Sequence, residues 1–171
     1  MKALAQVVYG IADNADKVAV YNALKGIYDR LSSVCLSTAG LAIKTTNSPL
    51  VSVKTECKVL ADGKLVTVGT QDCAVLAGTI TATYYNVFCF FCDSSGTLTT
   101  AMGTEAATLA AVKFPPIPGK KAMLGFITIL AGDSNAFIGN DSTAGQLDVT
   151  TYAKTITYTN TPFPFDSTAT I

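Results

Sequence analysis

The hydrophobic period of this sequence changes near residue 48, and that change constrains the fold more than any other feature. Between Asp16 and Cys35, apolar residues recur at alternating spacings of four and three, the a/d rhythm of helices that pack against copies of themselves. From about Ser48 onward, short Thr-rich segments are separated by Gly, Asp-Gly and Pro turns, which is typical of β-strands. We therefore expect an N-terminal helix followed by a β-domain. The apolar seam of the helix consists of Val20, Leu24, Ile27, Leu31 and Val34.

The expected helix has plausible start and stop signals. Asp13, Asn14 and Asp16 supply capping oxygens and negative charge for its first turn, and Gly40 supplies a left-handed residue after its end. The seam predicts self-association, with a homotrimer as the leading hypothesis. The alternative is a helix that packs on its own β-domain. A polar face favours the exposed bundle; it consists of Lys17, Asn22, Lys25, Asp29 and Ser32.

Two tyrosines and a cysteine, Tyr21, Tyr28 and Cys35, form a second stripe with a spacing of seven beside the seam. This stripe widens the apolar face beyond what a two-stranded coiled coil needs. A helix of about twenty residues is marginal on its own, so any oligomer must also be held by the β-domains.

The rest of the chain predicts an antiparallel β-sandwich or barrel-like domain, because strand patterns and turn signals follow one another at intervals of about ten residues. The fold class is therefore mainly β, with residues 1–47 as an N-terminal arm and oligomerisation helix and residues 48–171 as the β-domain. Pro115, Pro116 and Pro118 predict an extended connector inside it. The expected strands are residues 51–59, 64–68, 85–93, 97–102, 121–130, 136–138 and 150–159.

Composition limits the function classes. Charged residues make up only 14% of the chain, against roughly 25% in an average soluble domain, and hydrophobic residues make up 49%. A surface with so little charge predicts coverage by partner subunits. Twelve basic residues balance twelve acidic ones without a basic run, so we expect no nucleic-acid partner. No apolar run reaches the length of a membrane span, so we expect no membrane partner.

The sequence lacks the residues of common catalytic and metal sites. It contains no histidine, which excludes Ser-His-Asp and Cys-His sites and imidazole ligands for zinc. Cys89 and Cys92 have the spacing of a redox or half-zinc motif, but they lie in an aromatic strand pattern without a second pair. We expect no enzyme activity, no metal and no cofactor. The five cysteines are expected to be buried free thiols: Cys35, Cys57, Cys73, Cys89 and Cys92.

Two further groups of residues allow a structural or a functional interpretation. Oxygen-rich turn residues suit a calcium site, although turn formation explains them first; they are Asp133, Asn135, Asn140 and Asp141. A cluster of aromatic residues suits the core, but an outward-facing subset of it would suit a subunit interface or a sugar-stacking surface. This cluster consists of Tyr84, Tyr85, Phe88, Phe90 and Phe91.

An ordered set of short motifs between about residues 76 and 166 resembles a known β-domain. The set consists of Leu76-Ala77-Gly78-Thr79, Phe91-Cys92-Asp93-Ser94-Ser95-Gly96-Thr97-Leu98-Thr99, Ala101-Met102-Gly103-Thr104, Phe114-Pro115-Pro116-Ile117-Pro118, Lys120-Lys121-Ala122-Met123-Leu124-Gly125-Phe126-Ile127 and Tyr158-Thr159-Asn160-Thr161-Pro162-Phe163-Pro164-Phe165. It resembles a domain of tailed-phage virion surface proteins, of the head-fibre or capsid-decoration type and the crAss-like kind. The cysteines and the short loop Gly139–Gly145 depart from the family pattern.

The resemblance implies a structural protein on the outside of a phage head, made in the host cytoplasm, trimeric, and bound to the major capsid protein or another virion protein. The alternative is a β-sandwich module that binds glycans on host surfaces, with the helix as a trimerising stalk. The C-terminal Pro/Phe segment, 162–171, is expected to lie as a strap along the β-domain. In the structural reading, the apolar N-terminal arm is the expected capsid anchor, through Leu4, Val7, Val8, Tyr9 and Ile11.

Overall fold

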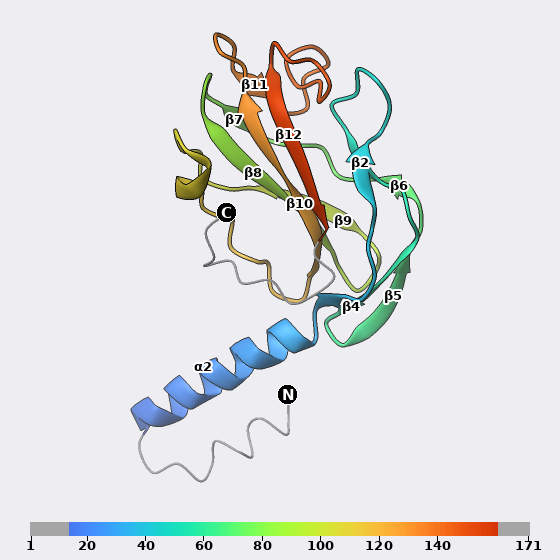
Figure 1. Ribbon diagram of the computed structural model, residues 1–171. Helices are drawn as coiled ribbons and strands as arrows, with labels where there is room; N and C mark the ends of the chain where they lie inside the picture. The colour runs from blue at the N-terminus through green and yellow to red at the C-terminus, as the bar shows by residue number, and fades with distance from the viewer. Residues whose placement is uncertain (1–13, 161–171) are drawn as a thin grey trace.

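The computed structural model describes residues 14–160, apart from the side chains of residues 14–16, 29 and 30. One helix precedes a set of antiparallel strands (Figure 1). The elements are α2 (Asn14–Leu31), β1 (Val34–Cys35), β2 (Leu41–Ile43), β3 (Val51–Val53), β4 (Cys57–Ala61), β5 (Lys64–Val68), β6 (Gln71–Asp72), β7 (Thr79–Ile80), β8 (Tyr85–Cys92), β9 (Leu98–Met102), the 3-10 helix η1 (Leu109–Ala111), β10 (Ala122–Ala131), β11 (Phe137–Ile138) and β12 (Ala153–Asn160).

The strands form antiparallel sheets around a shared core. The largest sheet has the order β12-β10-β8-β9, two three-stranded sheets have the orders β1-β4-β5 and β2-β3-β6, and β11 pairs with β7. Buried side chains from the four-stranded sheet and from both three-stranded sheets meet in one hydrophobic core, as between the layers of a sandwich. The strands of residues 14–160 close no barrel. The predicted fold class, mainly β with an N-terminal helix and an antiparallel domain, is confirmed.

Strand β8 is buried on both faces because every second residue is apolar on each side. Phe88, Phe90 and Cys92 lie in the main core, whereas Val87 and Phe91 belong to a second, smaller core on the opposite face. A strand buried on both faces reads as a continuous apolar run rather than an alternating one. This explains why the sequence of β8 is apolar except for one residue, Asn86. That side chain is buried but satisfied: its Oδ1 accepts the Val87 N–H at 2.7 Å.

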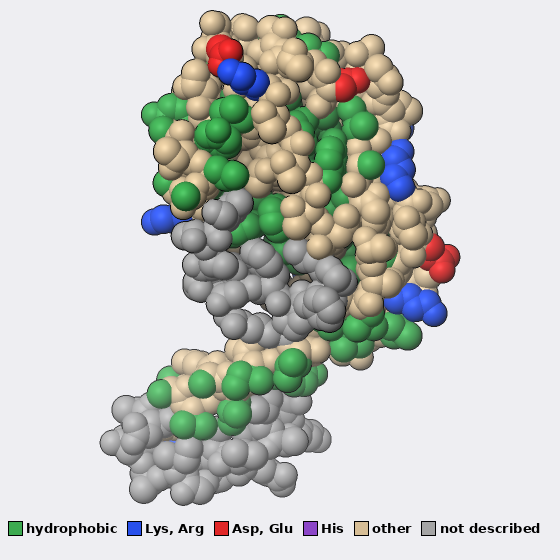
Figure 2. Space-filling view, in the orientation of Figure 1, with side chains coloured by type: hydrophobic (Ala, Val, Ile, Leu, Met, Phe, Trp, Pro, Cys, Tyr) green, Lys and Arg blue, Asp and Glu red, His purple; other side chains and the backbone are tan. Residues whose placement is uncertain are grey.

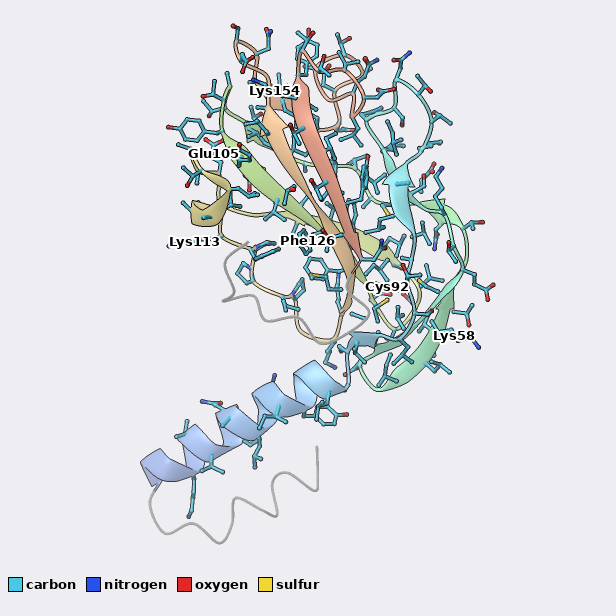
Figure 3. All side chains as sticks on the ribbon, viewed as in Figure 1. Lys58, Cys92, Glu105, Lys113, Phe126 and Lys154 are labelled. Carbon is cyan, nitrogen blue, oxygen red and sulfur yellow. The ribbon has the colours of Figure 1, made fainter. Side chains whose placement is uncertain are left out.

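The second core lies under the proline-rich connector between β9 and β10. The ring of Phe114 from this connector meets the ring of Phe126 from β10 edge-on, with the ring centroids 5.0 Å apart (Phe126 is labelled in Figure 3). The pairing of β10 with β8 shifts its register between Met123 and Gly125, as at a β-bulge. The bulge changes the phase of the alternation, so that Leu124 before it and Ile127 after it both face the main core while Phe126 faces the second.

The prediction that the helix continues to Cys35 is wrong. The helix ends at Leu31, and Val34 and Cys35 pair with Leu60 and Val59 as strand β1. The carbonyl of Ser32 accepts the Gly63 N–H at 2.8 Å, so a tertiary contact with the β4–β5 turn replaces the next helical hydrogen bond. Val34, the last member of the predicted seam, is therefore not part of the helix.

The predicted strand 51–59 is also interrupted. It forms two strands, β3 and β4, because the N–H groups of Lys54 and Thr55 donate to the carbonyl of Ala39, at 3.1 and 3.2 Å, and leave the ladder. Gly40, predicted as the cap of the helix, lies immediately before β2 instead and has φ 58°. Strands β1 and β2 pair with β4 and β3, so the sheets begin ahead of residue 48.

The first predicted hairpin is confirmed. Strands β4 and β5 pair from Cys57–Val68 to Ala61–Lys64, with Asp62 and Gly63 as the turn. Both turn residues have positive φ, 52° and 76°, which a two-residue hairpin turn of this type requires.

The second hairpin turn, between β8 and β9, predicts a pH dependence of stability. The Asp93 carboxylate accepts the Ser95 hydroxyl at 2.6 Å and the N–H groups of Ser95 and Thr97, and these hydrogen bonds lower its pKa. A lowered folded-state pKa stabilises the protein above the unfolded value, and that contribution is lost as the pH falls through the folded pKa. Asp93→Asn should therefore lower the melting temperature at pH 6, and the difference from the wild type should shrink as the pH falls below the ordinary carboxyl pKa and through the lowered pKa of Asp93. A difference that persists unchanged in acid would contradict this account.

Candidate functional site

The helix α2 carries an exposed apolar surface. Ile27 and Leu31 of the predicted seam are 55% and 63% exposed, and Tyr28 beside them is 42% exposed. Val20 and Leu24 are partly exposed. In the part of the chain that the structure describes, no strand packs along α2, which points away from the sheets (Figure 1). Figure 2 shows hydrophobic side chains on the visible face of the helix. Large apolar side chains grouped in this way mark an interaction surface.

The C-terminal end of α2 is fixed to the β4–β5 turn. The Ser32 N–H continues the helical pattern by donating to the Tyr28 carbonyl at 2.8 Å, and the Ser32 carbonyl then accepts the Gly63 N–H. Next to it, the Asp62 N–H donates to Ser33 Oγ at 3.1 Å. Lys120 Nζ forms an exposed ion pair with Asp62 Oδ2 at 3.1 Å. The hydrogen bonds of Ser32 and Ser33 join the C-terminal end of the helix to the β-domain. The apolar face of the helix therefore projects from the β-domain next to the β4–β5 turn.

The structure brings together only part of the predicted site. Four seam residues lie on α2, and Val34 lies in β1. The predicted capsid-anchor residues, Leu4 to Ile11, and the predicted C-terminal strap lie outside the described residues. Both therefore remain predictions.

The phenylalanines of the aromatic cluster pack inside the protein. Phe88, Phe90 and Phe91 are each no more than 1% exposed. The rings of Phe88 and Phe137 meet edge-on, with their centroids 6.3 Å apart. Tyr84, at 36%, lies at the margin of exposure. The three phenylalanine rings therefore supply packing, and none of them lies on the surface where it would stack on a sugar.

The oxygen-rich residues between β10 and β12 have structural partners. Asp141 Oδ1 accepts the N–H groups of Thr143 and Ala144, both at 2.7 Å, which lowers the pKa of that carboxyl. Asp133 forms an ion pair with Lys154 at 2.6 Å. No group of three or more His, Cys, Asp or Glu side chains within residues 14–160 is arranged to hold a metal ion. The contacts of Asp141 are therefore those of a turn, and those of Asp133 are those of a surface ion pair.

All five cysteines are buried free thiols. Burial raises the pKa of Cys73 and of Cys89 to about 12, and that of Cys92 to about 11. These side chains therefore stay protonated at neutral pH, where a thiol is a poor nucleophile and metal ligand. Cys92 faces the main core and Cys89 the second core, so the C-x-x-C pair is split between opposite faces of β8.

We expect that folding needs neither a disulfide nor a metal. The melting temperature in reductant plus a chelator should equal that in buffer alone, because the thiols are unpaired in the folded protein. The folded protein should also react slowly with a thiol reagent, and the denatured protein should release five equivalents. A large drop in melting temperature with the chelator would show that a metal site has been overlooked.

Sequence reasoning missed one set of exposed apolar residues near the end of the helix. Leu36 and Leu65 are 52% and 57% exposed on the outer face of the β1-β4-β5 sheet. The sequence feature that could have revealed them is leucine at positions 60 and 65. In a sheet with one face in the core and the other in water, alternation predicts polar residues at these positions.

Comparison with known proteins adds no relative. No protein-family model matches the chain, and neither a curated protein nor a solved structure is significantly similar to it. No helix within residues 14–160 has the length and hydropathy needed to cross a bilayer.

Proposed function

We propose that this chain is a non-enzymatic structural protein of a phage virion, which assembles with copies of itself through α2 and projects its β-domain from the capsid. The single observation that supports this proposal best is the exposed apolar seam of a helix whose contacts with the β-domain, within the described residues, lie at its C-terminal end. The resemblance of residues 76–166 to phage virion surface proteins supports a location on the outside of a phage head.

The residue types along the seam support a trimer over a dimer. Leu24 and Leu31 fall at the a positions of the heptad, and Val20 and Ile27 fall at the d positions. Leucine at a with isoleucine at d favours three or four strands over two. Tyr28, half-exposed beside the seam, widens the contact face in the same direction.

Quantitative mass spectrometry of purified phage particles tests the location. A structural protein should be present at a fixed, high copy number in every preparation, in constant ratio to the major capsid protein. The control is a lysate of uninfected host cells carried through the same purification. Absence from particles, or a ratio that varies between preparations, would contradict a structural role.

Attachment to the capsid is proposed to run through the N-terminal arm. Deleting residues 1–12 should leave a folded oligomer that no longer joins particles, because the arm supplies the apolar anchor residues while α2 supplies assembly. Particles assembled with the truncated protein and then purified would show this by mass spectrometry. Attachment through the N-terminal end would be overturned if the truncated protein still decorates particles and deletion of residues 162–171 abolishes decoration.

The alternative function, a glycan-binding module, gains no support from the aromatic strand. Phe88, Phe90 and Phe91 of the predicted aromatic cluster lie in the two cores, whereas Tyr84 is 36% exposed. Soluble-glycan binding by the isolated protein would be the result that restores this alternative.

A further inference from the structure

We infer that the outer face of the β1-β4-β5 sheet forms a second contact between copies of this chain, a collar at the base of the helix bundle. This inference rests on the proposed self-assembly through α2. It goes further by naming the part of the β-domain that completes the interface.

Three apolar side chains lie side by side across the outer face of this sheet. Val34 of β1 pairs with Leu60 of β4, and Leu60 pairs with Leu65 of β5. Val59 and Ala61, the neighbours of Leu60, are fully buried, so the alternation of the strand directs Leu60 outward. Leu60 and Val34 are partly exposed, and Leu65 is 57% exposed.

A fourth apolar residue, Leu36, lies in the next row of this face, beside the exposed polar residues Lys58 and Thr67. Leu36 follows the buried Cys35 and is 52% exposed, and its N–H donates to the Lys58 carbonyl at 2.8 Å. Leu36 therefore lies on the same outer face, one step along the sheet from Val34. We call these four residues the collar: Val34, Leu36, Leu60 and Leu65. A sheet with one face in water normally carries polar residues there, so four outward apolar residues indicate a covered face.

The collar is continuous with the seam of the helix. Leu31 and Val34 are separated by only two serines, and Ser32 is hydrogen-bonded to the β4–β5 turn. A Cβ atom placed on Gly63 of that turn would lie 3.7 Å from Tyr28 Oη, so the tyrosine of the helix reaches the hairpin that carries Leu65. Figure 2 shows hydrophobic side chains at the end of the β-domain where α2 joins it, on the face that also shows the apolar side chains of the helix.

The occupant that we infer for the collar is a second copy of this chain. A helix of 18 residues is about 27 Å long, and helices of this length are marginal by themselves. Stable protein–protein interfaces bury on the order of 1,200–2,000 Å² of accessible surface in total. We therefore expect a stable assembly to use surface of the β-domain in addition to the short seam of α2. In a cyclic trimer every copy carries the same collar next to the C-terminal end of its helix. We infer that the three collars contact one another around the symmetry axis.

Charged substitutions in the collar test this inference. Leu65→Glu and, on the other edge of the sheet, Leu36→Glu replace exposed leucines, and Leu109→Glu makes the same change in η1, where Leu109 is 37% exposed. Sedimentation equilibrium should show that each collar variant raises the concentration needed for half-assembly by about tenfold or more, whereas Leu109→Glu leaves it unchanged. Thermal unfolding followed by circular dichroism should show three folded proteins.

The outcomes separate the two proposals. A wild-type protein that is monomeric at micromolar concentration overturns assembly itself, and with it the proposed function. A wild-type trimer whose half-assembly concentration is the same in both collar variants as in Leu109→Glu overturns the collar alone. A trimer that is weakened in both collar variants and not in Leu109→Glu supports the inference.

Discussion

Replacing Ile27 by aspartate is expected to turn the assembled protein into a monomer. Ile27 is 55% exposed on α2 and occupies the d position at the middle of the seam. Burying such a side chain contributes about 1.5–3 kcal/mol per copy, and a carboxylate in its place would have to be desolvated without a partner. The concentration needed for half-assembly should rise about 100-fold or more, as light scattering at several protein concentrations would show.

Val18→Asp is the matched control for this substitution. Val18 is 59% exposed on the same helix, but it lies off the seam. It introduces the same charge on the same helix away from the seam, so it should leave the assembly intact. If both variants dissociate equally, the seam has no special role and helix stability alone explains the effect.

Replacing Phe88 by alanine is expected to give the largest loss of stability in the β-domain. The side chain is fully buried in the main core and meets the ring of Phe137 edge-on. Truncating a buried phenylalanine costs about 3–5 kcal/mol through lost transfer free energy and the cavity left behind. Urea unfolding of both proteins at the same protein concentration keeps the mass-action contribution of assembly comparable in the two measurements.

Tyr84→Ala provides the comparison for the Phe88 substitution. Tyr84 belongs to the same aromatic segment but is 36% exposed, so its loss should be much smaller, about 1 kcal/mol. Equal losses for the two variants would contradict the assignment of Phe88 to the core centre.

Local signals in the sequence predicted the elements whose structure is decided locally. The Asp62-Gly63 pair fixes its hairpin because both residues accept positive φ. The apolar segments around β8 and β10 were recognised as strands from their β-branched and aromatic residues. The helical course of the segment that carries Val20, Leu24, Ile27 and Leu31 followed from its apolar spacing.

Tertiary contacts decided what the sequence did not predict. Strand β11 pairs with β7, a strand more than fifty residues earlier, and not with β10, its neighbour along the chain. The end of α2 and the break at Lys54 both depend on hydrogen bonds to distant backbone, at Gly63 and Ala39. No local pattern encodes such partners.

The candidate site likewise has one part that the sequence predicted and one part that it did not. The seam of α2 was visible in the sequence as a heptad pattern, because its residues lie within three turns of one helix. The collar was not, because Val34, Leu60 and Leu65 are brought together only by the pairing of three strands. Their exposure becomes evident once Val59 and Ala61 are seen to fill the core.

Sedimentation equilibrium of the purified full-length chain tests self-assembly, the central claim, most directly. The account predicts a single species with three times the mass of the 17.8 kDa chain at micromolar concentration, unchanged in reductant. A single species with the mass of one chain over the same concentration range would contradict it.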